Sequence, residues 1–309
     1  MTRTQPGRSA LGRTAIAPLV LSVAVVILNV PRCLAQDSTD RQARAGGTIA
    51  FEVASIHKDT GPFKRPSFPL SPDDAFREPN GRFHADFALP NYIQFAYKIW
   101  FTDEELRAML AKLPRWVETD RFDIEANAPL HATKDQYRLM MQALLAERFG
   151  LKVHFEKKEL PVLAMVLAKP GRPGPKLIPH EQGQSCDEKP KPETFPQECY
   201  GVLAMPAKDG MVLYGSRATS MPAIAEFVGV AVGRTGDIAR RVVDQTGLTG
   251  LWDFTLEAAP PDQTLLKDGG AAGETLFEAI GDQLGIKLKS VRAVVSVLVV
   301  DHVERPSDN

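Results

Sequence analysis

The chain contains six histidines, the side chains that most readily bind a metal ion or carry a proton near neutral pH. They are His57, His84, His131, His154, His180 and His302. No two of them stand in an H-E-x-x-H arrangement and no C-x-x-C pair occurs, so the usual zinc-binding spacings are absent. We therefore assign no metal ligand and expect no cofactor, although scattered ligands could still converge in the fold.

One polar cluster lies near the end of the chain, formed by Asp301, His302 and Glu304. On a β-strand, His302 and Glu304 would share a face and Asp301 would point to the other face. The cluster fits an acid/base pair or half of a metal site. It also fits polar residues at the frayed end of a last strand, which is the interpretation we favour.

Signatures of nucleophilic catalysis are absent as well. The chain has no G-x-S-x-G elbow and no S-x-x-K motif, and neither Cys186 nor Cys199 has a plausible base beside it. The glycine-rich segments 233–236 and 269–273 lack the spacing of a phosphate-binding loop. A glycosidase needs two carboxylates that converge over a cleft, which one sequence cannot show. The catalytic residues stay unknown, and no cofactor-binding residue is assigned.

The N-terminus has the pattern of a cleavable signal peptide. Three arginines and no acidic residue occupy residues 1–13, and an apolar run follows from Ala15 to Val30. Small residues at Cys33 and Ala35 predict cleavage after Ala35. A membrane anchor would need about 20 apolar residues, and a lipoprotein would need a small residue where Arg32 stands. We expect a secreted or periplasmic protein with no membrane span after cleavage.

The mature chain is mildly acidic. Removing residues 1–35 deletes four arginines, which leaves 33 basic and 38 acidic side chains and a formal charge of −5. No basic surplus favours nucleic acid or an anionic membrane as a partner.

Two cysteines remain after cleavage, Cys186 and Cys199, in a proline-rich segment. In an oxidising compartment such a pair is expected to form a disulfide. A redox-active pair is the alternative, and it would need a tighter spacing such as C-x-x-C. The pattern favours a structural disulfide.

Two parts of the mature chain resemble each other, which predicts an internal duplication. The segment Arg121 to Ala126 resembles Asp253 to Ala258 at an offset of 132, and Phe149 to Val153 resembles Leu284 to Leu288 at an offset of 135. The small change in offset is one that a loop absorbs easily. The same order of elements is therefore expected twice.

Helix starts are marked in both halves. Thr133 with Gln136, and Thr275 with Glu278, fit the capping box, in which the two side chains satisfy backbone donors of the first turn. After each helix a short strand is expected, which then enters a hairpin with the apolar run that follows it. These strands are predicted at 151–155 and 286–289.

The predicted fold class is α+β, as two tandem repeats of a small mixed sheet with helices packed on one face, roughly βαββαββ each. The expected domains are a signal peptide at 1–35, a first repeat at 36–169, a proline-rich linker with the cysteine pair at 170–212, and a second repeat at 213–309.

Five segments carry a resemblance to a known family: Phe51 to His57, Arg121 to Ala126, Leu144 to Phe149, Val242 to Gly250, and Val299 to Glu304. On these the chain resembles a large secreted family of unknown function, abundant in soil acidobacteria and sometimes fused to BlaR-type sensor peptidases. Each half is also similar in pattern to the short N-terminal domain of secretins and TonB-dependent receptors, which docks partners and is not catalytic. The resemblance implies export and a modular fold, and it implies no particular activity.

These observations favour a non-catalytic binding or interaction protein of the cell envelope or extracellular space. An extended peptide or an envelope protein is the expected partner, held by addition of a strand to a sheet edge. The alternative is a secreted hydrolase of polysaccharide or peptide, with carboxylates that only folding brings together.

Overall fold

The computed structural model describes residues 50–182, 185–186, 195–197, 199–233, 240–260 and 275–306. Six α-helices and ten strands occur in this part of the chain, which confirms the predicted α+β class. The predicted signal peptide at 1–35 lies outside the described residues. No described helix is long and apolar enough to cross a membrane.

The elements of the first part of the chain are β1 (Val53–Asp59), β2 (Arg82–Ala88), α2 (Leu89–Tyr97), α3 (Asp103–Leu110), α4 (Trp116–Thr119), β3 (Arg121–Asn127), α5 (Lys134–Arg148) and β4 (Lys152–Leu167). They are followed by β5 (Leu177–Pro179), the 3-10 turns η1 (His180–Gln182) and η2 (Lys208–Gly210), β6 (Leu203–Pro206), β7 (Val212–Ser220), α6 (Met221–Gly233), β8 (Val242–Asp244), β9 (Leu251–Ala258), α7 (Leu276–Leu284) and β10 (Ile286–His302). The order strand, helix, strand, helix, strand occurs in β2-α2-β3-α5-β4 and in β7-α6-β9-α7-β10, with α3 and α4 as additions in the first and β8 in the second.

The first sheet has the order β1-β3-β2, and all of its pairs are antiparallel. Alternate residues of β3, namely Phe122, Ile124 and Ala126, are buried, as period two requires of a strand with one face on a core. Helices α2 and α5 supply the other side of this first core, which includes Ile93 and Leu145. The opposite face of the sheet is therefore free to carry polar side chains.

The second sheet has the order β5-β9-β7-β6 and is also antiparallel. The second hydrophobic core of the protein contains Phe254 and Leu256 from β9 of this sheet, together with buried residues of α6 and α7. Both edge strands, β5 and β6, come from the segment predicted as a linker. The proline-rich segment thus contributes to the sheet that carries the second core.

The predicted capping boxes are both present, because Thr133 pairs with Gln136 and Thr275 with Glu278 in the reciprocal arrangement. Helix α7 ends at Gly285, whose φ of 68° is a left-handed conformation that glycine adopts without steric cost. Local sequence alone fixes these helix ends.

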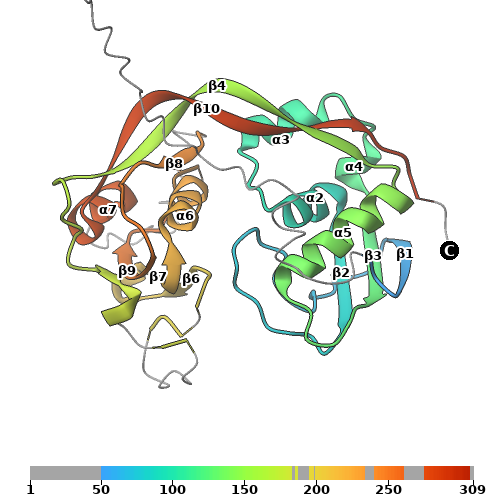
Figure 1. The fold of residues 1–309 in the computed structure, drawn as a ribbon, viewed down its shortest axis with the longest axis horizontal. Helices are drawn as coiled ribbons and strands as arrows, with labels where there is room; N and C mark the ends of the chain where they lie inside the picture. The colour runs from blue at the N-terminus through green and yellow to red at the C-terminus, as the bar shows by residue number, and fades with distance from the viewer. Residues whose placement is uncertain are drawn as a thin grey trace, which may run out of the picture. The chain divides into compact units, whose positions relative to one another are not determined.

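The hairpins expected within each half are wrong. β4 and β10 are each continuous and pair with one another, from Ile286 opposite Leu167 to His302 opposite Lys152 (Figure 1). The segments that were expected to turn, 156–161 and 290–293, contain no glycine, asparagine or aspartate, so each strand continues through them. β8 joins β4 in parallel, which makes this third sheet mixed. The paired strands β4 and β10 contribute to both cores, because Leu298 of β10 belongs to the first core and Met165 of β4 to the second.

Candidate metal centre

The face of the first sheet that points away from the first core is rich in ionisable side chains, and we call it the polar face. It consists of Ser55, His57, Asp59, His84, Asp86, Arg121, Asp123 and Glu125. In the strand register, Asp123 lies between His57 and Asp86, and Glu125 lies between Ser55 and His84. Period two on three paired strands therefore gathers residues that are far apart in the sequence.

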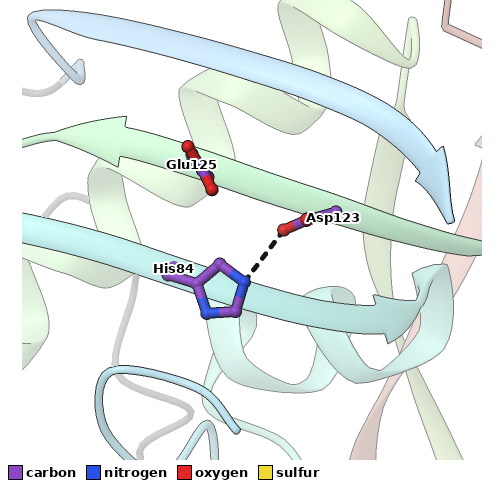
Figure 2. Close-up of side chains that lie close together, drawn as sticks. All are labelled: His84, Asp123 and Glu125. Atoms are coloured by element: carbon purple, nitrogen blue, oxygen red, sulfur yellow. Dashed lines mark ion pairs between the residues drawn. The ribbon is translucent and has the colours of Figure 1, made fainter. Parts of the chain in front are cut away.

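Three of these side chains form the closest group, His84 on β2 with Asp123 and Glu125 on β3 (Figure 2). Each offers one ligand atom, and these atoms lie within 4.8 Å of one another. Nε2 of His84 is 3.0 Å from Oδ1 of Asp123. Both atoms are buried, and neither takes part in a hydrogen bond of acceptable geometry.

The contact made by Nδ1, the other ring nitrogen of His84, indicates that Nε2 is the atom available to bind a metal ion. Nδ1 lies 3.2 Å from the backbone carbonyl oxygen of Arg65. Because a carbonyl oxygen can only accept a hydrogen bond, Nδ1 is the nitrogen that carries the proton when the ring is neutral. Nε2 then directs a lone pair toward a carboxylate oxygen. Two lone pairs at this distance repel each other unless a cation lies between them or Nε2 also binds a proton.

The separation suits a metal ion. Two ligands that each lie about 2.1 Å from an ion are about 3.0 Å apart when they meet at a right angle and about 3.4 Å apart at the tetrahedral angle of zinc. The observed 3.0 Å fits the first, and a small side-chain movement would give the second. Glu125 is exposed and adds an oxygen from the same strand as Asp123. A backbone carbonyl that holds the second ring nitrogen is also the usual support of a metal-binding histidine. The alternative is an ion pair between a protonated His84 and Asp123.

Charged neighbours complete the polar face. The ammonium group of Lys64 binds Oδ2 of Asp123, and this hydrogen bond raises the pKa of Lys64. Asp86 is fully buried beside Arg121, 3.3 Å away, and burial raises the pKa of its carboxyl group. The backbone N–H of Gly61 lowers the pKa of Asp59. Four carboxylates thus share the face with two basic side chains, an excess of negative charge that favours a cation.

The cluster predicted near the C-terminus lies where β10 ends, with Glu304 two residues beyond the strand. Nε2 of His302 lies 2.7 Å from Glu304, and Asp301 instead lies 2.8 Å from Nδ1 of His154. Nε2 of His154 lies 3.2 Å from Glu156, and hydrogen bonds with the two carboxylates raise the pKa of this ring, that with Asp301 most. All these side chains are exposed, so the arrangement is that of surface ion pairs.

The predicted disulfide between Cys186 and Cys199 is present. The expectation that neither cysteine has a base beside it is wrong, because Nε2 of His180 lies 3.7 Å from Sγ of Cys186. His180 is six residues before Cys186 in the sequence, a spacing that belongs to no familiar catalytic motif. The strand that ends at Pro179 and the chain reversal at η1 bring it there.

Sequence reasoning also missed the grouping of His84, Asp123 and Glu125. The available signal was the alternation H-x-D in 84–86 and D-x-E in 123–125, with apolar residues between. Alternation shows that such residues share a face, but which residues of two strands are opposite depends on the register.

A family model described as a protein of unknown function, DUF3738, matches residues 90–303. The chain belongs to this family. The match confirms membership of a family of unknown function, as the sequence resemblance predicted. Comparison with curated proteins and with solved structures found no similar protein. Asp123 and Glu125 lie inside the matched range, and His84 lies six residues before it.

Proposed function

We propose that this DUF3738 protein is an exported, non-catalytic binding protein of the cell envelope or extracellular space, and that its polar face binds one divalent metal ion through His84, Asp123 and Glu125. One observation carries the proposal. Nε2 of His84 and Oδ1 of Asp123 are 3.0 Å apart, buried, and without a hydrogen bond. With His84 neutral, a cation between or beside them converts a repulsive contact into two bonds.

The ligand set indicates the class of ion. One imidazole nitrogen with two carboxylate oxygens suits zinc and neighbouring first-row ions better than calcium, which prefers six to eight oxygens. Three protein ligands would leave at least one coordination position open, as in zinc sites that accept a further ligand. An imidazole or carboxylate of a partner could fill it.

The topology of the first sheet supports a peptide or envelope protein as that partner. β1 and β2 are its two edges among the described strands, and His57 on β1 and His84 on β2 share the polar face. On β2 the backbone N–H and C=O of His84 already bond to Ser67, so an added strand would continue the sheet from the β1 edge. Its main chain would supply affinity, and its metal-binding side chain would supply selectivity.

Export and duplication belong to the same proposal. The signal-peptide pattern of residues 1–35 supports export, and the Cys186–Cys199 disulfide suits an oxidising compartment. The recurrence of element order in β2 to β4 and β7 to β10 supports a duplicated module.

Titration of the purified protein with zinc, manganese and calcium chlorides in a calorimeter tests the proposal. We expect one zinc ion per chain, weaker manganese binding, and a loss of zinc affinity of at least tenfold in His84→Ala. His302→Ala is the matched control, since its ring also faces a carboxylate but on an exposed strand end, and it should bind zinc as the wild type does. Absence of zinc binding, or equal losses in both variants, would contradict the metal site and leave the ion pair as the explanation.

The rival function, a secreted hydrolase, would need two acidic or histidine side chains free to act in one pocket. A hollow of about 310 Å³ is lined by Glu278 and Asp282 of α7. Glu278 is already used, because its carboxylate accepts the backbone N–H of Thr275 in the capping box and this hydrogen bond lowers its pKa. The hollow therefore gives the hydrolase no support.

A further inference from the structure

The disulfide has a histidine and an aspartate aligned behind one of its sulfurs. Nε2 of His180 lies 3.7 Å from Sγ of Cys186, and Nδ1 lies 2.7 Å from Oδ1 of Asp253. The side chains of His180 and Asp253 are 18% and 10% exposed, so solvent reaches the ring only in part. The order sulfur, imidazole, carboxylate is that of a nucleophile, its base, and the group that orients the base.

The second sheet fixes this alignment. β5 pairs with β9, which places Ile178 opposite Asp253 and delivers His180 at the next turn of the chain. In β7 the register shifts between Ser216 and Thr219, and Ala218 in this bulge has φ of 51°. The bulge turns the N–H of Ala218 toward Asp253, which accepts it at 2.8 Å. A bond from the rigid backbone therefore holds the carboxylate that in turn orients His180.

The contact with Asp253 also selects the ring's tautomer. Asp253 uses Oδ1 to accept from both Ala218 and His180, so Nδ1 carries the proton of the neutral ring. Nε2 is left facing the sulfur of Cys186. In this position it can give a proton to a departing thiolate, or take one from a thiol.

Arg217 joins the two backbone segments that carry the cysteines. Its side chain is buried, and it donates to the backbone oxygens of Gln197 at 2.8 Å and Ser185 at 3.5 Å. These residues flank the two cysteines, and Cys199 forms a β-bridge with Arg217 itself. Both cysteines are partly exposed, as reactive cysteines are, so a thiol reductant can reach them.

We propose that Cys186–Cys199 is a site of thiol–disulfide exchange that accepts two electrons from a dithiol reductant, with Cys186 as the leaving sulfur and His180 as its proton donor. The proposal concerns a region apart from the metal-binding polar face and does not depend on that function. It replaces the purely structural role that sequence spacing favours for the disulfide.

The exchange balances in two steps. A thiolate of the reductant, its proton lost to solvent, attacks Sγ of Cys199, the S–S bond breaks, and its electron pair goes to Sγ of Cys186. Protonated His180 gives the Nε2 proton to this sulfur and regains a proton from solvent. The second thiol of the reductant then loses its proton to solvent, and its thiolate attacks the reductant sulfur of the mixed disulfide. This releases Cys199, which is protonated from solvent. The reductant leaves as a disulfide, and the protein holds two thiols.

Two measurements on the purified protein test the direction and the role of His180. With glutathione as a monothiol probe, acid quenching and mass spectrometry should find the mixed disulfide on Cys199 and a free Cys186. With dithiothreitol, His180→Gln should be reduced about tenfold more slowly, because glutamine can still donate to Asp253 but cannot donate a proton to a thiolate. His302→Gln is the matched control and should react at the wild-type rate. A mixed disulfide on Cys186, or equal rates in wild type and His180→Gln, would overturn the proposal.

A third measurement needs no variant and decides the matter even if His180→Gln does not fold. In the reduced wild type, iodoacetamide should alkylate Cys186 with a rate–pH midpoint well below about 8.5, the value for an ordinary cysteine. Cys199 serves as the internal comparison and should have the higher midpoint. A midpoint for Cys186 at or above that of an ordinary thiol would refute the proposed role of the site.

Discussion

The polar face and the disulfide region both contain a buried aspartate in contact with a histidine, yet the two pairs use opposite nitrogens. In the first, a backbone oxygen holds Nδ1 of His84, and Nε2 faces Asp123. In the second, Asp253 holds Nδ1 of His180, and Nε2 faces a sulfur. The nitrogen that the fold occupies decides what the other can do. A histidine held by a carbonyl offers a ligand atom next to a carboxylate, and one held by a carboxylate becomes a base.

The two aspartates also differ in the hydrogen bonds that their Oδ1 atoms accept. Oδ1 of Asp253 accepts two hydrogen bonds, one of them from the main chain. Oδ1 of Asp123 accepts none of acceptable geometry. A satisfied carboxylate stabilises the fold, whereas an unsatisfied buried oxygen costs free energy that a ligand can recover.

The largest expected effect concerns metal-dependent stability. Zinc at about one hundred times its dissociation constant should raise the free energy of unfolding of the wild type by about 2.7 kcal/mol, and Asp123→Asn should abolish this gain. Thermal unfolding with and without zinc, and after chelation, measures it. A gain of equal size in Asp123→Asn would show that zinc binds elsewhere.

The next effect separates the two aspartates without metal. Asp253→Ala leaves the buried N–H of Ala218 without its acceptor and should lower the free energy of unfolding by about 1 to 3 kcal/mol. Asp123→Ala should lower it by less, because Oδ1 has no hydrogen bond to lose and Oδ2 loses only an ion pair with the exposed ammonium group of Lys64. Urea unfolding of the two variants in chelator gives the comparison. A larger loss for Asp123→Ala would reverse the proposed distinction.

A smaller effect tests the competition for Asp123. The ammonium group of Lys64 binds Oδ2 of Asp123 and opposes an arriving cation. Lys64→Met should therefore tighten zinc binding by about threefold to tenfold, since it removes one nearby positive charge. Lys58→Met is the control, because Lys58 pairs with Asp120 instead. Weaker zinc binding in Lys64→Met would place Lys64 among the groups that support the ion.

The smallest effect comes from a histidine–carboxylate pair on the surface. Hydrogen bonds with Asp301 and Glu156 raise the pKa of His154 above its unfolded value of 6.5. Their contribution to stability is therefore fully present below pH 6.5 and is lost as the pH rises through the folded pKa. His154→Gln should lower the melting temperature slightly at pH 5.5 and leave it unchanged at pH 9. The reverse pH dependence would contradict the ion pairs.

Much of the fold could be predicted from local sequence. The capping boxes at Thr133 and Thr275 depend on neighbouring residues, and both appear where the sequence placed them. The two segments that resemble each other, 121–126 and 253–258, both lie in strands, β3 and β9. The pairing of β4 with β10 could not be predicted, because antiparallel partners more than a hundred residues apart leave no local mark. A hairpin was expected within each half, whereas β4 and β10 both continue through the expected turn and pair with each other.

The candidate sites failed to appear in the sequence for the same physical reason. His84 and Asp123 meet only because β2 pairs with β3 in one register. A shift of one residue would turn every side chain of β2 to the other face. His180 meets Cys186 because β5 pairs with β9. β5 has only three residues, too few for alternation to reveal it as a strand. The disulfide itself was predictable from composition and compartment, but the base beside it depended on the fold.

X-ray absorption at the zinc edge, with the protein loaded with one equivalent of zinc, identifies the ligand atoms of the proposed site. We expect only nitrogen and oxygen ligands at about 2.0 to 2.2 Å, with one histidine contribution that is lost in His84→Ala. A sulfur ligand at about 2.3 Å, or a spectrum unchanged by His84→Ala, would contradict the proposed site.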